Sequence, residues 1–248
     1  MKLPFLSASF AVMLGLMGNL TPASAQSQEQ FIKAFSGKWQ TLDTSYSNGS
    51  LCSVDLLSTK QGAGYEISIQ GCEGDITEIA SWGIVENQLA MLDDAGAIRI
   101  RLGGNQNRMT GQTISGRAVI FERAGTAMSA VSAAAISDGA CLYLGYTATC
   151  AEAGDLADLT PPPGGGLLTA QVLVNLNARA EARSDAPVVA VVQENTCVVV
   201  EQCLQASDGR WCKARLQNAS AWIKQQAIRA NRWPVLTFKG SCEPLAGG

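Results

Sequence analysis

The fold of the first module is clearest in residues 88–123, which read QLAMLDDAGAIRIRLGGNQNRMTGQTISGRAVIFER. Short runs of alternating apolar and polar residues are separated by turn residues, as in LDDAG. In AIRIRLG, Ile98, Ile100 and Leu102 share one face and the two arginines between them share the other, since successive side chains of a strand point to opposite faces. The stretch therefore predicts consecutive antiparallel strands joined by hairpin-length turns.

The same pattern continues toward the N-terminus and gives eight expected strands, at residues 38–43, 52–57, 64–70, 79–84, 88–93, 97–103, 108–114 and 117–123. Eight sequential antiparallel strands close into an up-and-down barrel, which removes exposed edges. The inward positions are bulky and are expected to fill the lumen; they are Trp82, Ile84, Leu89, Met91, Ile98 and Ile100. A filled lumen disfavours the alternative of a small-molecule carrier of the lipocalin kind.

Residues 1–25 have the three parts of a secretory signal peptide: Lys2, an apolar stretch, and Ala23-Ser24-Ala25 before the expected cleavage site. The apolar run is shorter than the roughly 20 residues of a membrane span. We therefore expect a soluble, periplasmic or secreted protein that begins at Gln26 and does not span the membrane. An uncleaved N-terminal anchor is the alternative.

The eight cysteines fit an exported protein, because oxidising compartments let disulfides persist and an even number allows all to be bridged. They fall into three groups, within which pairing is simplest: Cys52 and Cys72; Cys141 and Cys150; and Cys197, Cys203, Cys212 and Cys242. Zinc ligation is the rival interpretation. It is disfavoured because the chain has no C-x-x-C pair and no histidine.

The absence of histidine also excludes a Ser-His-Asp triad, a Cys-His peptidase and a His-ligated zinc enzyme. Catalysis by a carboxylate pair stays formally open. However, the acidic residues lie in turns or alternate outward on strands, as solvated charges do. We expect no enzyme, no catalytic residues, no metal and no cofactor. The net charge of −3, divided between an acidic first half and a basic second half, does not suggest a nucleic-acid partner.

Residues 125–166 are rich in Ala, Gly, Ser and Thr and end in TPPPGGG, a composition typical of a linker. The linker separates two β-rich modules, each large enough to own a core. Within it, CLYLGYTATC is expected to be a small disulfide-closed loop. Its Tyr143 and Tyr146 are expected to pack against a neighbouring domain, and ligand binding is the alternative.

Several motifs of the first module resemble the bacterial alkaline protease inhibitor (Inh) family over about residues 30–124. They are Phe35-Ser36-Gly37-Lys38-Trp39, the cysteines at 52 and 72, Trp82, LAMLDDAGAIRIRL and Phe121-Glu122-Arg123. Members are small periplasmic eight-stranded barrels that inhibit secreted zinc metalloproteases of the serralysin type. An N-terminal trunk enters the protease cleft. The resemblance implies a trunk at residues 26–34 and a barrel at residues 35–124.

By this resemblance the protease-binding residues are the first five of the mature chain: Gln26, Ser27, Gln28, Glu29 and Gln30. Stretched out, they would lie along the cleft and bring the N-terminal amine to the catalytic zinc. The sequence departs here from the more apolar, serine-led trunk of the family. An N-terminal glutamine can also cyclise, which would leave a carbonyl or the Glu29 carboxylate to reach the metal. The alternative is a polar leader without a partner.

The second module, residues 167–248, resembles the bacterial SH3 domain, with matching residues Leu176, Asn177, Arg179, Trp211, Lys213, Arg215 and Trp222. Such domains commonly bind peptides or peptidoglycan, and many act as spacers. Trp211 and Trp222 either line an aromatic groove or belong to the core, which is favoured for Trp222. Cys203 and Cys212 flank a hairpin turn and are expected to bond. Cys197 and Cys242 would then tie back the C-terminal tail.

The sequence thus predicts an exported all-β protein: an eight-stranded up-and-down antiparallel β-barrel followed by a small SH3-like β-barrel. The expected function is inhibition of a zinc metallopeptidase of the serralysin type, with the SH3 module localising the protein or contacting the target. The alternative is a non-inhibitory envelope protein that binds peptidoglycan through its SH3 domain.

Overall fold

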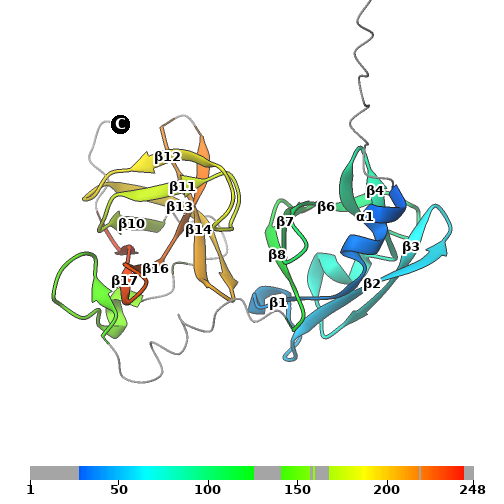
Figure 1. Cartoon of the computed structure of the whole chain (residues 1–248), viewed down its shortest axis with the longest axis horizontal. Coiled ribbons are helices and arrows are strands. Elements are labelled where there is room, and N and C mark those ends of the chain that lie inside the picture. Colours follow the sequence, from blue (N-terminus) through cyan, green and yellow to red (C-terminus); the bar gives the residue numbers. More distant parts are fainter. Residues whose placement is uncertain (1–27, 126–140, 157–158, 160–167, 218, 243–248) are drawn as a thin grey trace, which may run out of the picture.

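The structure is a computed structural model that describes residues 28–125, 141–156, 159, 168–217 and 219–242 (Figure 1). As predicted, the fold is all-β. The strands of its first part are β1 (Gly37–Thr41), β2 (Cys52–Gln61), β3 (Gly64–Gln70), β4 (Ser81–Val85), β5 (Gln88–Leu92), β6 (Ile98–Gly104), β7 (Arg108–Thr113) and β8 (Ala118–Arg123). The helical elements are α1 (Gln28–Phe35) and three short 3-10 helices at Thr44–Tyr46, Gly74–Glu78 and Ala153–Leu156.

Strands β1 to β8 form a closed barrel in which each strand pairs with its neighbour in the sequence. The barrel closes where β1 pairs antiparallel with β8, through Trp39 opposite Arg123 and Gln40 opposite Glu122. The predicted up-and-down barrel is therefore confirmed. Local alternation was sufficient to predict it because each strand pairs with the next along the chain.

The barrel interior is filled by side chains, as the sequence predicted. Trp82, Leu89, Met91 and Ile100 are fully buried in one cluster, and the half-buried Ile84 packs against it. The indole of Trp82 donates a hydrogen bond to the Leu57 carbonyl at 2.9 Å, which satisfies its buried N–H.

The expectation for Ile98 was wrong. This side chain is only half-buried and lies outside the core cluster. It stands at the first position of β6, opposite Leu92, where the register of the β5–β6 pair shifts between Met91 and Leu92. Such a bulge bends the strand and redirects the neighbouring side chains, and the alternation of the sequence does not reveal it.

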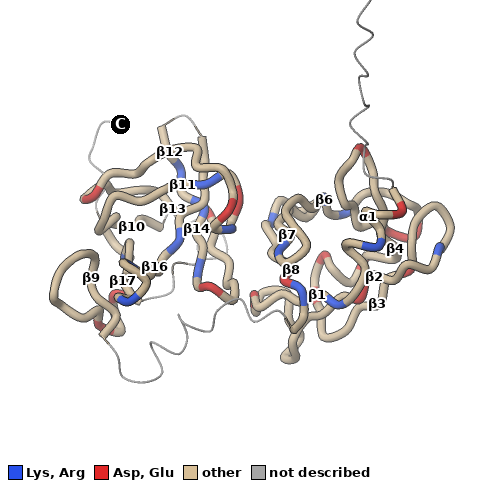
Figure 2. The backbone as a smooth tube through the Cα atoms, viewed as in Figure 1, with Lys and Arg blue, Asp and Glu red and all other residues tan. Residues whose placement is uncertain are grey.

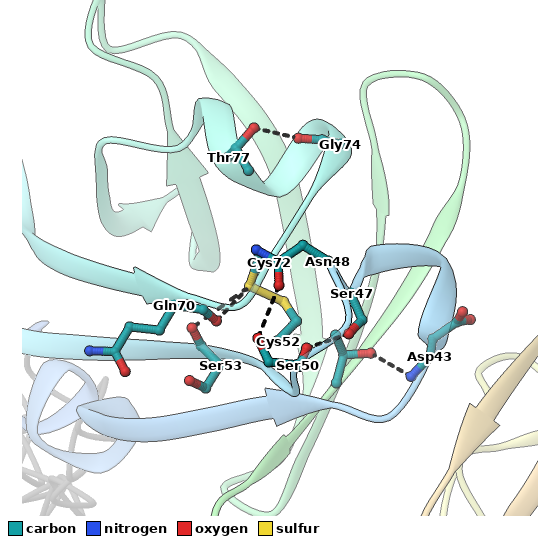
Figure 3. Close-up of a disulfide and its surroundings, with 11 residues drawn as sticks. Asp43, Ser47, Asn48, Ser50, Cys52, Ser53, Gln70, Cys72, Gly74 and Thr77 are labelled. Carbon is teal, nitrogen blue, oxygen red and sulfur yellow. Dashed lines mark hydrogen bonds between the residues drawn. A yellow bond between two sulfur atoms is a disulfide. The ribbon is translucent and has the colours of Figure 1, made fainter.

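Cys52 and Cys72 form the first of four disulfides, with their Cα atoms 4.3 Å apart. Figure 3 shows the bond between the start of β2 and the turn that follows β3. Ser50 and Asn48, in the loop leading into β2, are hydrogen-bonded beside it, at 3.0 Å from Oγ to Oδ1. Closing a loop of this length contributes about 3 kcal/mol by the loop-entropy argument. The disulfide therefore staples the barrel, as predicted.

The second part of the chain is also built of strands: β9 (Tyr143–Leu144), β10 (Leu168–Val172), β11 (Leu176–Arg179), β12 (Val188–Val192), β13 (Cys197–Ala206), β14 (Gly209–Arg215), β15 (Ser220–Lys224), β16 (Gln226–Arg229), β17 (Trp233–Leu236) and β18 (Phe238–Gly240). Seven of them form one sheet in the order β12-β11-β15-β14-β13-β10-β18, and the others form a small sheet in the order β16-β17-β9. A second β domain is thus present.

The remaining disulfides join the pairs expected from the sequence: Cys141–Cys150, Cys197–Cys242 and Cys203–Cys212. Cys203 and Cys212 lie directly opposite each other in the β13–β14 hairpin. The Cys197–Cys242 bond ties the segment after β18 back to the start of β13. All four pairings are therefore confirmed.

The disulfide loop of the linker belongs to the second domain. Its strand β9 pairs parallel with β17. The ring of Tyr143 meets the edge of Trp233 at 5.7 Å, and the Arg229 guanidinium lies 4.2 Å from the centre of the Tyr146 ring. Both tyrosines therefore contact residues 226–236 of the domain that includes their loop, and Tyr146 stays 56% exposed. The TPPPGGG segment lies outside the described residues.

Candidate functional site

The predicted protease-binding segment is helical where the structure describes it. Gln28, Glu29 and Gln30 form the first turn of α1 and are exposed. Gln26 and Ser27 lie outside the described residues. These residues were expected to be extended, and the helix corrects this for the free chain from Gln28 onward.

The signal for this helix is present in the sequence but was missed. Phe31, Ile32 and Phe35 are spaced by one, three and four positions, which places them on one face of a helix. Ile32 is 4% exposed, and both phenylalanines pack against the barrel core. The two phenylalanine rings stack with their centres 4.4 Å apart. An amphipathic helix thus packs its apolar face on the barrel, against β2 and β4.

The C-terminal end of α1 is fastened by Trp39 of β1. The Trp39 indole donates to the Phe35 carbonyl at 2.9 Å, and the two rings stack with their centres 6.3 Å apart. Trp39 itself is fully buried. The helix end is therefore held by a residue of the barrel core.

Arg123, at the end of β8, supports the same junction. Its Nη1 donates to the Ser36 carbonyl at 3.0 Å and its Nη2 donates to the Ala34 carbonyl at 2.7 Å. The guanidinium also lies 4.4 Å from the centre of the Trp39 ring. The last carbonyls of a helix lack intrahelical partners and carry partial negative charge, so a cation here is favourable. Arg123 and Trp39 together fix the helix end relative to the barrel.

The N-terminal end of α1 lies at the surface. Its first turn is polar, and Glu29 lies where the helix dipole favours a negative charge. The apolar face of α1 is anchored to the barrel from Phe31 onward. The place on the barrel from which the residues before Phe31 extend is therefore fixed. The geometry can present a short peptide to a partner.

The described residues contain no group of three or more His, Cys, Asp or Glu side chains that could hold a metal ion. Within the same part of the chain, no helix is long and apolar enough to cross a membrane.

The two tryptophans proposed for an SH3 groove are both buried, with Trp211 1% and Trp222 9% exposed. The Trp211 indole donates to Asp208 Oδ1 at 3.1 Å. Trp211 and Trp222 border two different pockets, so the structure does not bring the rings together in one open groove. Of the two sequence-based alternatives, their positions fit the core.

Trp222 belongs to an apolar cluster that joins the two domains. Ala118 and Ile120 of β8 contribute from the barrel, and the second domain contributes Ala182, Leu204, Ala206, Trp211 and Trp222. Figure 1 shows β7 and β8 on the side of the barrel that faces the second domain, and β8 contacts β13. The second domain therefore docks on the outer face of β7 and β8.

An ionic cluster crosses this interface and is almost completely buried. Arg108 of β7 pairs with Glu122 of β8, with Nη2 2.5 Å from Oε1, and with Asp208 of the second domain, with Nη2 2.7 Å from Oδ1. Their exposed fractions are 1%, 3% and 7%. Ser207 adds two hydrogen bonds to Glu122, from its backbone N–H at 2.9 Å and from its hydroxyl at 2.7 Å.

Further polar contacts surround the ionic cluster. The Thr110 hydroxyl donates to Glu181 Oε2 at 2.7 Å, and the Ala118 N–H donates to Gln202 Oε1 at 3.0 Å. Because buried charges need such partners to offset their lost hydration, this surface is specific to the second domain. Acidic residues were expected to be solvated, and this expectation was wrong for Glu122 and Asp208.

The interface should weaken in acid. Burial alone would raise the pKa of Asp208, but the hydrogen bond and charge of Arg108, with the charge of Lys224, hold it below its usual value. A carboxylate with a lowered pKa contributes stability that is present above its unfolded pKa, about 3.9, and is lost as the pH falls through the folded value.

We therefore expect the chain to melt at a higher temperature than Asp208→Asn, with the largest difference above about pH 5. This difference in melting temperature should shrink as the pH falls below about 4. Thermal unfolding of both proteins between pH 7 and pH 3 measures this. A margin that does not change with pH would contradict the role assigned to Asp208.

The barrel segment matches a known protein family. Residues 30–123 match the family described as "Protease inhibitor Inh", and this segment forms the eight-stranded barrel and most of α1. The match covers the first domain, which is less than half of the chain, so the barrel is similar to protease inhibitors of this family.

The chain is also similar to the outer membrane lipoprotein omp19 of Brucella melitensis and of Brucella suis. In each case 31% of 108 aligned residues are identical, and the alignment covers 43% of this chain. The chain spans only 58% of the length of these relatives.

Proposed function

We propose that this chain is an exported inhibitor of a zinc metallopeptidase of the serralysin type. The observation that carries the proposal is the anchored helix α1, which holds a polar N-terminal segment at a fixed position on an Inh-type barrel. The family supports a protease as the target. The four disulfides and the outer-membrane relatives support action outside the cytoplasm, in the periplasm or after secretion.

The inhibitory element in this proposal is the segment Gln26–Gln30. If α1 stays intact, only two residues precede it after cleavage, and they reach about 7 Å when extended. If the first turn unwinds, five residues reach about 17 Å, enough to occupy several substrate subsites. Binding to a protease should therefore convert Gln28, Glu29 and Gln30 from helix to extended chain.

This conversion breaks the helical hydrogen bonds that the carbonyls of residues 28–30 accept, so contacts in the protease cleft have to offset that loss. The three side chains are exposed, so no apolar contact with the barrel is lost. The first N–H groups of a helix have no intrahelical acceptor, and a protease cleft offers extended backbone partners for them. The conversion would stop at Phe31, because Phe31 and Ile32 pack against the barrel core. The structure of the free chain thus supports a trunk of limited length.

Two groups of the trunk can meet a catalytic zinc ion. An N-terminal amine has a pKa of about 7.7–8.0, so it is partly neutral near pH 7.5 and can donate its lone pair. If Gln26 cyclises, the amine is lost, and the Glu29 carboxylate becomes the strongest ligand in the segment. Inhibition by the cyclised form would then depend on Glu29.

For the second domain we propose the bacterial SH3 type and a role in localisation or target contact. It docks on β7 and β8, whereas α1 packs against β2 and β4, so the domain does not compete with the anchored helix for the same strands. Its excess of basic residues suits an anionic wall polymer such as peptidoglycan. Sedimentation of the whole chain with peptidoglycan at low salt, and release as salt rises, would support this role.

A protease panel tests the proposed function. The mature chain is titrated against a serralysin-type zinc metallopeptidase and, in parallel, against trypsin as a serine protease control. The proposal expects inhibition that saturates at one inhibitor per metallopeptidase and leaves trypsin active. Unchanged metallopeptidase activity at excess inhibitor would overturn the proposal and favour the non-inhibitory envelope protein. Inhibition of trypsin alone would move the target to another protease class.

A further inference from the structure

A second pocket lies within the second domain, and Trp211 of the apolar interface cluster forms part of its wall. It has a volume of about 340 Å³ and is bordered by β11, β15 and β16, by the segment between β10 and β11, and by the disulfide loop. Its polar lining consists mainly of Arg179, Lys224, Arg229, Asn175, Asn177 and Ser184. The side chains that line it include three cations and no carboxylate.

Of these three cations, only Lys224 has a carboxylate partner in the described part of the chain. Its Nζ lies 2.9 Å from Asp208 Oδ2. Arg108 is also paired with Asp208, and Glu122 completes a group of two cations and two carboxylates. The charge of Lys224 is therefore balanced within the protein.

Arg179 and Arg229 are not balanced in this way. Arg179 Nη1 donates to the Ala186 carbonyl at 2.6 Å, and the Arg229 guanidinium lies over the ring of Tyr146. Both partners are neutral, and no ion pair to either arginine is present among the described residues. Figure 2 shows the basic positions of β11 and β16 in this domain. The pocket thus has two excess positive charges.

The backbone that carries Tyr146 is held in place, and the Tyr146 side chain is 56% exposed. The Cys141–Cys150 bond closes the loop that carries it, and the neighbouring Gly145 N–H donates to the Leu236 carbonyl at 3.0 Å. Gly145 has φ of +59°, and a Cβ atom added to it would lie 2.9 Å from the Leu173 carbonyl oxygen. The loop backbone therefore lies close against the segment that contains Leu173. The disulfide and this close approach hold the loop backbone at the edge of the pocket.

We propose that this pocket binds a small anionic ligand through a carboxylate or phosphate group. The planar guanidinium groups of Arg179 and Arg229 can each donate two parallel hydrogen bonds to such a group. The amide groups of Asn175 and Asn177 add neutral donors. The volume is within the range of roughly 300–1,000 Å³ found for small-ligand sites. This site does not depend on the proposed protease inhibition, which uses α1 on the other domain.

Isothermal titration of the whole mature chain tests the site, with inorganic phosphate as one probe, citrate as a second, and uncharged N-acetylglucosamine as the control ligand. Saturable binding of phosphate or citrate, and none of the neutral sugar, is expected. Phosphate alone would identify a phosphoryl ligand and citrate alone a carboxylate ligand. Absence of saturable binding by both anions would overturn the proposal.

Substitutions of single arginines test whether the anion binds in this pocket. Arg229→Gln is expected to weaken the anion at least tenfold, and Arg179→Gln to do the same if the fold is retained. Arg229 is exposed and donates no structural hydrogen bond to the described backbone, so its variant should keep the native melting temperature within a few degrees. Arg215→Gln is the matched control, because Arg215 is also exposed on a strand but pairs with Glu201 outside the pocket. Equal affinity in Arg229→Gln, or equal loss in Arg215→Gln, would contradict the site.

Discussion

Replacement of Arg108 by methionine is expected to lower the free energy of unfolding by about 3–5 kcal/mol, because removing one member of a buried ionic cluster leaves its partners uncompensated. Glu122 and Asp208 would both stay buried between the domains without the guanidinium that they share. Equilibrium unfolding in urea measures the loss. Methionine keeps the unbranched shape of the side chain, so most of the effect is electrostatic.

Two further variants check the interpretation. Arg101→Met removes a strand arginine whose ion pair with Glu86 is exposed, and it should cost under about 1 kcal/mol. A triple variant, Arg108→Met with Glu122→Gln and Asp208→Asn, should recover part of the stability because no unpaired charge stays buried. If Arg108→Met were no more harmful than Arg101→Met, the interface would be open in solution and the ionic cluster unimportant.

Replacement of Trp39 by alanine is the second large effect, with an expected loss of about 3–5 kcal/mol for a fully buried tryptophan. Trp39 also holds α1, through its indole N–H and its contact with the Phe35 ring. The variant should therefore lose amide protection in α1 before the barrel strands do. Hydrogen exchange measured residue by residue, together with urea unfolding, would show both effects.

Trp39→Phe is the matched control. It keeps an aromatic ring in the core and loses the hydrogen bond to the Phe35 carbonyl, so its cost in unfolding free energy should be smaller than that of Trp39→Ala. Protection of α1 should then fall only partly. If Trp39→Ala left the exchange of α1 unchanged, the helix would be held by Phe31 and Ile32 alone.

The barrel could be predicted because the sequence pattern that specifies it lies within short segments of the chain. Several strands alternate and each strand pairs with the next, so the fold follows largely from residues close together in the chain, although residues 42–51 and 71–80 form longer connections. The disulfides followed for a similar reason, since three of the four pairs are separated by 20 residues or fewer. The shift at Leu92 could not be predicted, because a bulge depends on the ladder and not on the pattern.

The candidate site was predicted less completely. Gln28, Glu29 and Gln30 are polar, which suggested a free tail, and the anchoring face of α1 is only three residues wide. The docking of the second domain had no local signal. Arg108 and Asp208 lie 100 residues apart, and each looks like an ordinary surface charge in its own segment. A long-range contact of this kind needs the tertiary structure.

The central claim is that the residues before Phe31 carry the inhibition. The most direct measurement compares the inhibition constants of two forms of the chain for one serralysin-type metallopeptidase, one form beginning at Gln26 and the other at Phe31. Both keep Phe31, Ile32 and Phe35, which pack against the barrel core, so equal melting temperatures would show that the fold is intact. The account predicts that the shorter form binds at least tenfold more weakly, a loss of about 1.4 kcal/mol. Equal inhibition by both forms would contradict it and place the binding on the barrel surface.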